Sequence, residues 1–235
     1  MTFSQFYFGM DGTSGPPFPC TGNGHSYYIG RLGGEITEGG IGFNLSSAKA
    51  ATYLLTSGYW DIGGPGIIPP GKSAYQWGQQ QANAFLSAYN TGPNAPYVLG
   101  QTLFGDIESG NFGWGVGTKT QGQDIVHGFI QTIANVGFSP GLYANRPDWD
   151  NLIGASWTSP TPFVWWLADT YVGITTCVEA QNEFNSLFFG NNIYSRGGYK
   201  VMVWQYNGTS GGSVRDLDLS PYNGYLSGRW NPTPA

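Results

Sequence analysis

The sequence contains little charge. Lys, Arg, Asp and Glu make up 10% of its 235 residues and leave a formal net charge of -5. Nucleic-acid binding requires clustered Lys and Arg that meet phosphates, whereas this chain has only 9 basic residues and no basic run. The composition therefore argues against a nucleic-acid partner.

Histidine, cysteine and long apolar segments are also scarce. A metal hydrolase is disfavoured because His25 and His127 are the only histidines, and His127 lies in an expected helix. Cys20 and Cys177 either form one disulfide or remain free thiols. No segment approaches the ~20 apolar residues of a membrane span, and no signal peptide is visible. A serine hydrolase is disfavoured because no GxSxG elbow occurs.

Glycine and aromatic residues are abundant by contrast. The chain has 38 Gly, 9 Trp, 15 Tyr and 14 Phe. Sugar rings present apolar C–H faces that pack on aromatic rings, and hydroxyls that bond to polar side chains. The composition fits a surface for a neutral, polyhydroxylated ligand, although the same aromatics would equally serve a buried core.

Short apolar runs alternate with amphipathic segments along most of the chain. Helices are expected at residues 44–58 (ended by Gly58), 73–92 and 120–137, with a short helical or turn element at 146–154. Strands are expected at 4–11, 25–32, 59–64, 96–108, 139–145, 163–169, 199–206 and 214–220. Residues 172–198 are expected to form a loop. Strands without polar alternation, separated by helices, are typical of a parallel sheet buried on both faces.

About eight strands predict an α/β fold, a single (β/α)8-type TIM barrel over residues 1–235 with weak helices in its C-terminal part. A doubly wound open sheet is the alternative. It is disfavoured because no GxGxxG turn follows the first strand. The Pro-rich residues 229–235 are expected to fray or to begin a linker.

Acidic residues gather at the expected strand ends. Asp11 ends the first strand, Asp106 and Glu108 end the central one, and Asp216 lies in the final VRDLD segment. Because parallel barrel strands point their carboxyl ends to one face, these side chains are expected to converge. We predict carboxyl separations of roughly 5 to 10 Å, the scale of a catalytic pair in glycosidases.

The spacing of Asp106 and Glu108 has a direct consequence. Residues i and i+2 of a strand point to the same side, so both acids face the barrel mouth and Ile107 faces away. Two such close carboxylates do not both ionise cheaply, so the pKa of one is expected to rise, as a proton donor for glycosidic cleavage requires. The alternative is structural: Asp106 caps the following turn and Glu108 is solvated.

In order and spacing, these features resemble the glycoside hydrolase family 25 (GH25) lysozymes and the related glycoside-hydrolase-like domains over nearly the whole chain. The motifs that carry the resemblance are FGMD (8–11), WGQQQANAFL (77–86), GDIE (105–108), GLYAN (141–145), WWLADTY (165–171) and VWQYNGTSGGSVRDLD (203–218). The resemblance implies a muramidase that cuts the β-1,4 bond between N-acetylmuramic acid and N-acetylglucosamine in peptidoglycan. No cofactor or metal is expected.

The resemblance also implies roles for individual residues. Glu108 would be the general acid, and Asp106 would either attack the anomeric carbon or assist the substrate's acetamido group. Asp11 and Asp216 would complete an acidic floor. The residues expected along the sugar cleft are Tyr143, Trp166, Gln205, Tyr206 and Asp169. Arg31, at another strand end, either grips a peptide-stem carboxylate or neutralises the acids around it.

Two departures from the lysozyme pattern keep other functions open. Asp218 stands where the lysozymes have Asn, and the loops 12–25 and 172–198 differ from the usual ones. The alternatives are a non-catalytic glycan-binding barrel, or a hydrolase or transglycosidase for a different polysaccharide. A monomer that is extracellular or directed to the cell wall is expected.

Overall fold

The computed structural model describes residues 7–11, 27–38, 55–92, 95, 100–110, 112–169, 177–187, 195–207, 216–220, 232 and 234. Only the backbone is described at residues 7–10, 37–38, 55–56, 177, 206–207 and 216–220. The predicted loop 12–25, residues 44–54 of the first expected helix, Cys20 and the side chain of Cys177 lie outside this described part.

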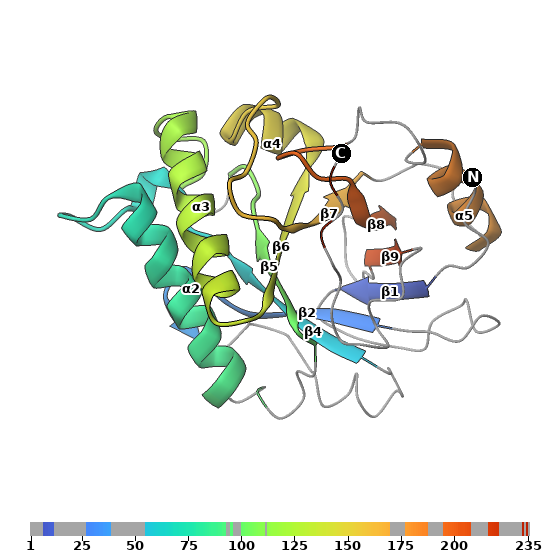
Figure 1. The fold of residues 1–235 in the computed structure, drawn as a ribbon, viewed down its shortest axis with the longest axis horizontal. Helices are drawn as coiled ribbons and strands as arrows, with labels where there is room; N and C mark the ends of the chain where they lie inside the picture. The colour runs from blue at the N-terminus through green and yellow to red at the C-terminus, as the bar shows by residue number, and fades with distance from the viewer. Residues whose placement is uncertain are drawn as a thin grey trace.

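The described strands form one sheet that closes on itself (Figure 1). They are β1 (Tyr7–Asp11), β2 (Tyr27–Gly34), β3 (Thr37–Glu38), β4 (Leu55–Asp61), β5 (Thr102–Asp106), β6 (Ser139–Asn145), β7 (Val164–Ala168), β8 (Val201–Asn207) and β9 (Asp216–Ser220). The order β1-β9-β8-β7-β6-β5-β4-β2 is closed by pairing of β1 with β2, and the short β3 lies on the edge of β2. The predicted α/β barrel is therefore confirmed.

The barrel departs from a regular (β/α)8 pattern at its last strand. β1, β2 and β4 to β8 are parallel, whereas β9 is antiparallel to both of its neighbours, β1 and β8. A parallel return requires a crossover of about a dozen residues or more, and only residues 208–215 separate β8 from β9. As a result, β9 begins, rather than ends, at the rim where β1 ends.

Helices cover the outside of the barrel (Figure 1). They are α2 (Ala74–Thr91), α3 (Lys119–Asn135), α4 (Arg146–Leu152) and α5 (Cys177–Leu187), with a 3-10 turn, η1 (Pro65–Ile67). Capping boxes begin α2 and α3: the Ser73 hydroxyl accepts from the Gln76 N–H, and the Gln76 side chain accepts from the Ser73 N–H. Thr118 and Gln121 repeat this arrangement.

The strands are buried on both faces, as expected. Phe104, Tyr143 and Trp166 pack inside the barrel in one cluster, whereas Leu103 and Ile107 pack in the larger cluster under the helices. Side chains along β5 therefore alternate between the two cores. This alternation decides which residues can reach the barrel interior.

Three predicted elements differ from the structure. Residues 55–58 lie in β4, so Gly58 sits within a strand and does not end a helix, because the short run YLLTSG fits either period. Of the expected strand 96–108, residues 96–99 lie outside the described part, and the described strand covers Thr102–Asp106. The expected loop 172–198 contains α5, whose Ala180 and Phe184 are buried one helical turn apart.

One residue of the tail that was predicted to fray forms a short β-bridge. Pro234 pairs with Tyr199 in an isolated β-bridge. Pro234 is therefore in contact with the domain, whereas most of residues 229–235 lie outside the described part.

Candidate active site

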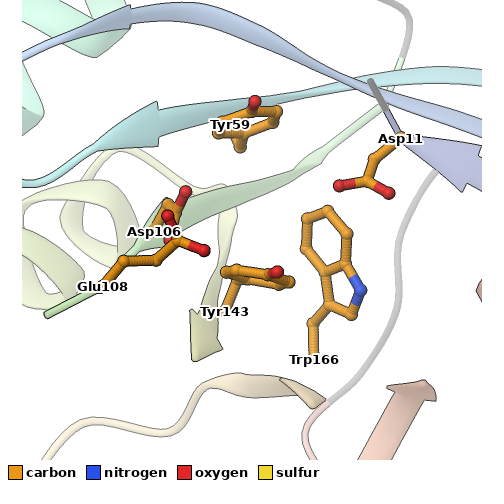
Figure 2. Close-up of a pocket in the computed structure, with 6 residues that line it drawn as sticks. All are labelled: Asp11, Tyr59, Asp106, Glu108, Tyr143 and Trp166. Atoms are coloured by element: carbon orange, nitrogen blue, oxygen red, sulfur yellow. The ribbon is translucent and has the colours of Figure 1, made fainter. Parts of the chain in front are cut away.

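The carboxyl ends of the parallel strands surround a cavity of about 160 Å³. Asp11 ends β1, Asp106 ends β5 and Glu108 follows two residues later. The lining residues are Asp11, Tyr59, Asp106, Glu108, Tyr143 and Trp166 (Figure 2). Figure 2 shows Asp106 and Glu108 together at the end of β5, with Asp11 on the other side of the cavity. The structure thus brings three of the four predicted acids to one cavity.

Ile107 faces away from this cavity. It is fully buried in the core under the helices, and its N–H donates to the Tyr143 carbonyl at 3.0 Å. This bond extends the pairing of β5 and β6 one residue beyond Asp106. Asp106 and Glu108 consequently share the cavity side, as their spacing predicts.

The turn after Glu108 is held by a buried carboxylate. Asp148 Oδ2 accepts a hydrogen bond from the Ser109 N–H at 3.1 Å and another from Asn145 Nδ2 at 2.7 Å. Asn145 in turn caps α4, because its side chain accepts from the Asp148 N–H at 2.8 Å. The end of β6 and the start of α4 therefore anchor the residue next to Glu108.

A hydrogen-bonded relay holds the opposite side of the cavity. The Tyr143 hydroxyl donates to Gln205 Oε1 at 2.9 Å. Gln205 Nε2 donates to both carboxyl oxygens of Asp11, at 3.1 and 3.2 Å. Gln205 is buried and holds two cavity residues, Asp11 and Tyr143, in fixed positions.

Asp61 and Arg31 form an ion pair next to Asp106. Burial raises the pKa of Asp106 well above its usual range, and the charges of Glu108, Asp61 and Asp11 raise it further. Burial also raises the pKa of Asp61 to about 6, opposed by the charge of Arg31 and reinforced by that of Glu108. A raised pKa was predicted for one carboxyl of the Asp106 and Glu108 pair, and Asp106 has one.

Aromatic rings form the remaining walls. The rings of Tyr143 and Trp166 meet edge to face with centroids 4.6 Å apart. The ring centroids of Tyr59 and Trp166 lie 6.3 Å apart, again edge to face. Trp166 is only 1% exposed, so it forms a packed wall and does not offer a broad open face. Burial raises the pKa of the Tyr59 phenol, as do the charges of Asp106, Asp11 and Asp61, which leaves a neutral hydroxyl that can donate.

Comparison with solved structures finds this architecture elsewhere. A GH25 lysozyme from Aspergillus fumigatus superposes with a TM-score of 0.62 and 16% identity, over 92% of this chain and 94% of that chain. The chain has the fold of the GH25 lysozymes. No family model and no curated protein matches the sequence.

Two further solved structures are similar to this chain. The autolysin LytC from Streptococcus pneumoniae, in complex with a synthetic peptidoglycan ligand, has a TM-score of 0.56 and 14% identity, over 91% of this chain and 46% of that chain. An uncharacterised B. stearothermophilus protein has a TM-score of 0.57 and 16% identity, over 95% of this chain and 100% of that chain. At such identities the likeness establishes the fold alone.

Two other predicted site residues, Arg31 and Asp169, are described but are not among the residues that line the cavity. Arg31 pairs with Asp61, and Asp169 follows β7, where its carbonyl accepts from Trp204 Nε1 at 2.9 Å. Burial raises the pKa of Asp169, and Arg146 opposes the shift. The side chains of Asp216 and Tyr206 lie outside the described part. The backbone of Asp216 is directly opposite Asp11 in the pairing of β1 with β9.

Sequence reasoning missed Tyr59 and Asp61. Asp61 ends β4 just as Asp11 and Asp106 end their strands, so the same rule would have found it. The signal was hidden by the expected helix 44–58, which delayed the start of this strand to residue 59 and placed Asp61 near its beginning.

The chemistry available at this site is proton transfer and charge stabilisation by carboxyl groups. Glu108, Asp106 and Asp11 surround the cavity, and Arg31 is a cation paired with the neighbouring Asp61. Among the described residues, no group of three or more His, Cys, Asp or Glu side chains is placed to hold a metal ion.

None of the described helices is both long and apolar enough to cross a membrane.

Proposed function

We propose that this protein is a glycoside hydrolase that cleaves peptidoglycan at the β-1,4 bond between N-acetylmuramic acid and N-acetylglucosamine. The observation that carries the proposal is the convergence of Asp11, Asp106 and Glu108 on one aromatic-walled cavity at the barrel rim. The shared fold of a lysozyme and of an autolysin bound to a peptidoglycan ligand supports this substrate class.

Glu108 serves in this proposal as the general acid that protonates the leaving oxygen. It lines the cavity, and the N–H of the next residue, Ser109, is held by Asp148. A positioned carboxylic acid is the usual proton donor in glycosidic cleavage. Asp11, held by two hydrogen bonds from Gln205, stabilises the positive charge that develops at the anomeric carbon.

Asp106 assists in a way that its environment favours. Its pKa lies well above the usual range because it is buried among other acids. A protonated carboxyl is a poor nucleophile, so direct attack on the anomeric carbon is disfavoured. Participation of the substrate's own acetamido group, oriented by Asp106, suits this site better.

Digestion of purified peptidoglycan tests the proposal. The wild-type protein should release fragments with N-acetylmuramic acid at their reducing ends, identified by mass spectrometry. Glu108→Gln should lower kcat by about 10²- to 10⁴-fold, the usual contribution of general acid catalysis, while binding of the glycan is retained. Asp150→Asn, which alters an ion pair with Arg196 away from the cavity, is the matched control.

Other outcomes of the digestion point to the alternatives. Glucosamine reducing ends would contradict the bond assignment. Binding without any cleavage by the wild-type protein would indicate a glycan-binding barrel. Cleavage or transfer on another polysaccharide in a glycan panel would change the substrate class.

The remaining proposals concern the whole chain. A peptidoglycan substrate would require action outside the cytoplasm, in keeping with the expected extracellular or cell-wall location. A cavity lined by residues of one chain is consistent with action as a monomer, which sedimentation analysis would test.

A further inference from the structure

Three neighbouring strands form a line of charged side chains beside the cavity. Arg31 on β2 pairs with Asp61 on β4, and Asp61 lies directly opposite Asp106 of β5 in the parallel ladder. The carboxyl groups of Asp61 and Asp106 are hydrogen-bonded to each other. The line Arg31, Asp61, Asp106 thus connects a cation outside the cavity wall to an acid that lines it.

This ion pair is built into the fold. Gly34 lies opposite Asp61, and a Cβ atom there would approach the Asp61 Cβ to 2.9 Å, so only glycine leaves room for this carboxylate. The Arg31 guanidinium lies 5.7 Å from the centre of the Phe112 ring. The side chains of Arg31 and Asp61 are only 23% and 12% exposed. Solvent therefore screens this pair less than an exposed one.

The surroundings decide which acid of the pair keeps a proton. Two carboxylates cannot share a hydrogen bond unless one of them is protonated. Asp61 has the cation Arg31 beside it. Asp106 faces Asp61, Glu108 and Asp11, together with the phenol of Tyr59. Its buried Oδ1 accepts no hydrogen bond from the described residues, so no donor favours its ionised form there. The charge therefore resides on Asp61 and the proton on Asp106.

We propose that Asp61, held by Arg31, is a positioning residue that accepts a hydrogen bond from the protonated carboxyl of Asp106. Asp106 is thereby fixed as a neutral acid whose other oxygen accepts a hydrogen bond from an N–H group of the substrate. An acetamido group on the sugar has such an N–H. The identity of this substrate group is the only part of the inference that rests on the proposed function. The pairing of Arg31, Asp61 and Asp106 does not depend on it.

Carboxyl 13C NMR on the intact protein tests the pairing without any substrate. The Asp106 signal is assigned by its loss in Asp106→Asn. In the wild type the titration midpoint of Asp106 should lie above that of Asp61, which titrates near pH 6. In Asp61→Asn the midpoint of Asp106 should fall by about one pH unit or more, since a neighbouring negative charge is removed.

Substitutions of Arg31 test the same pairing from the other end. Arg31→Met removes the cation that favours the ionised Asp61, so the Asp61 midpoint should move to higher pH. Arg31→Lys should restore most of the wild-type value. These two variants also decide the matter if Asp61→Asn does not fold. Arg196→Met, which breaks the separate pair of Arg196 with Asp150, should leave both midpoints unchanged.

Kinetics on peptidoglycan supply the second readout. Asp61→Asn should lower kcat by about 10- to 100-fold with little change in KM, the range caused by a misplaced group. In the dependence of kcat on pH, the acidic limb should move to higher pH in Arg31→Met but should not move in Arg196→Met. Loss of structure alone would not move this limb.

The outcomes separate this inference from the proposed function. An Asp106 midpoint that is equal in the wild type and in Asp61→Asn would overturn the inference, as would a wild-type Asp106 whose midpoint lies below that of Asp61. If the NMR results are as expected but the wild-type protein cleaves no peptidoglycan, the proposed function fails while the positioning role of Asp61 stands.

Discussion

Asp148 shows how a residue outside the cavity can control one inside it. Its carboxylate accepts the N–H of Ser109, the residue after Glu108, and does not itself line the cavity. We predict that Asp148→Ala lowers kcat on peptidoglycan by about tenfold, because Glu108 is then less well placed. Steady-state kinetics would measure this. Asp150→Ala, on the same helix, should leave kcat unchanged, and an equal loss in both variants would contradict the role.

Asp61 should also make stability depend on pH. Its pKa is raised from the ordinary 3.8 to about 6 in the folded protein, so the folded state takes up this proton more readily than the unfolded state. The resulting stability is complete below about pH 4 and is lost as the pH rises through 6.

A denaturation series measures this contribution. The free energy of unfolding of the wild type, relative to Asp61→Asn, should fall by up to about 3 kcal/mol between pH 4 and pH 7. Urea unfolding of both proteins across this range gives the difference. A difference that is constant with pH would show that folding does not shift the pKa of Asp61, and one that grows as the pH rises would show that folding lowers it; either result would contradict the raised pKa.

At the scale of elements, two glycines set the distance between α2 and α3. A Cβ atom on Gly78 would overlap the Ile125 carbonyl oxygen, and one on Gly128 would overlap the Tyr75 carbonyl oxygen. Because each glycine meets the backbone of the other helix, neither contact can be relieved by rotating a side chain. The glycines therefore allow α2 and α3 to pack side by side (Figure 1).

We predict that Gly78→Ala destabilises the protein by about 1–3 kcal/mol, the usual cost of overpacking, although alanine favours a helix. Thermal or urea unfolding measures the change. Asn83→Ala, at an exposed position of the same helix, should be close to neutral. If Gly78→Ala were stabilising, the close approach of the helices would be contradicted.

Element assignments succeeded where the pattern was long and failed where it was short. The helices at 73–92 and 120–137 have caps and several apolar turns, and both occur close to the expected bounds. The segment that contains Gly58 and the segment of α5 are short runs whose state depends on what they pack against. Phe184, for example, packs on Trp204 of β8 with ring centroids 6.2 Å apart, a contact that the sequence does not reveal.

At the scale of the molecule, closure joins both ends of the chain. β1 pairs with β2 on one side and with β9 on the other, so the first and last described strands belong to the same sheet as the middle. We predict that the chain unfolds as a single domain, in one cooperative transition. Far-ultraviolet circular dichroism and tryptophan fluorescence should give the same midpoint, and two separate transitions would indicate independent parts.

The sequence by itself determined the alternation of strands and helices, the acids at strand ends and the opposite directions of Ile107 and its two neighbours. These three features depend on local periodicity, which can be read from a stretch of about ten residues. Only the tertiary structure decided that β9 is antiparallel, that Arg31 pairs with Asp61, and that Asp61 meets Asp106. Each of these depends on the register between strands distant in sequence and on closure of the barrel, and no local pattern specifies either.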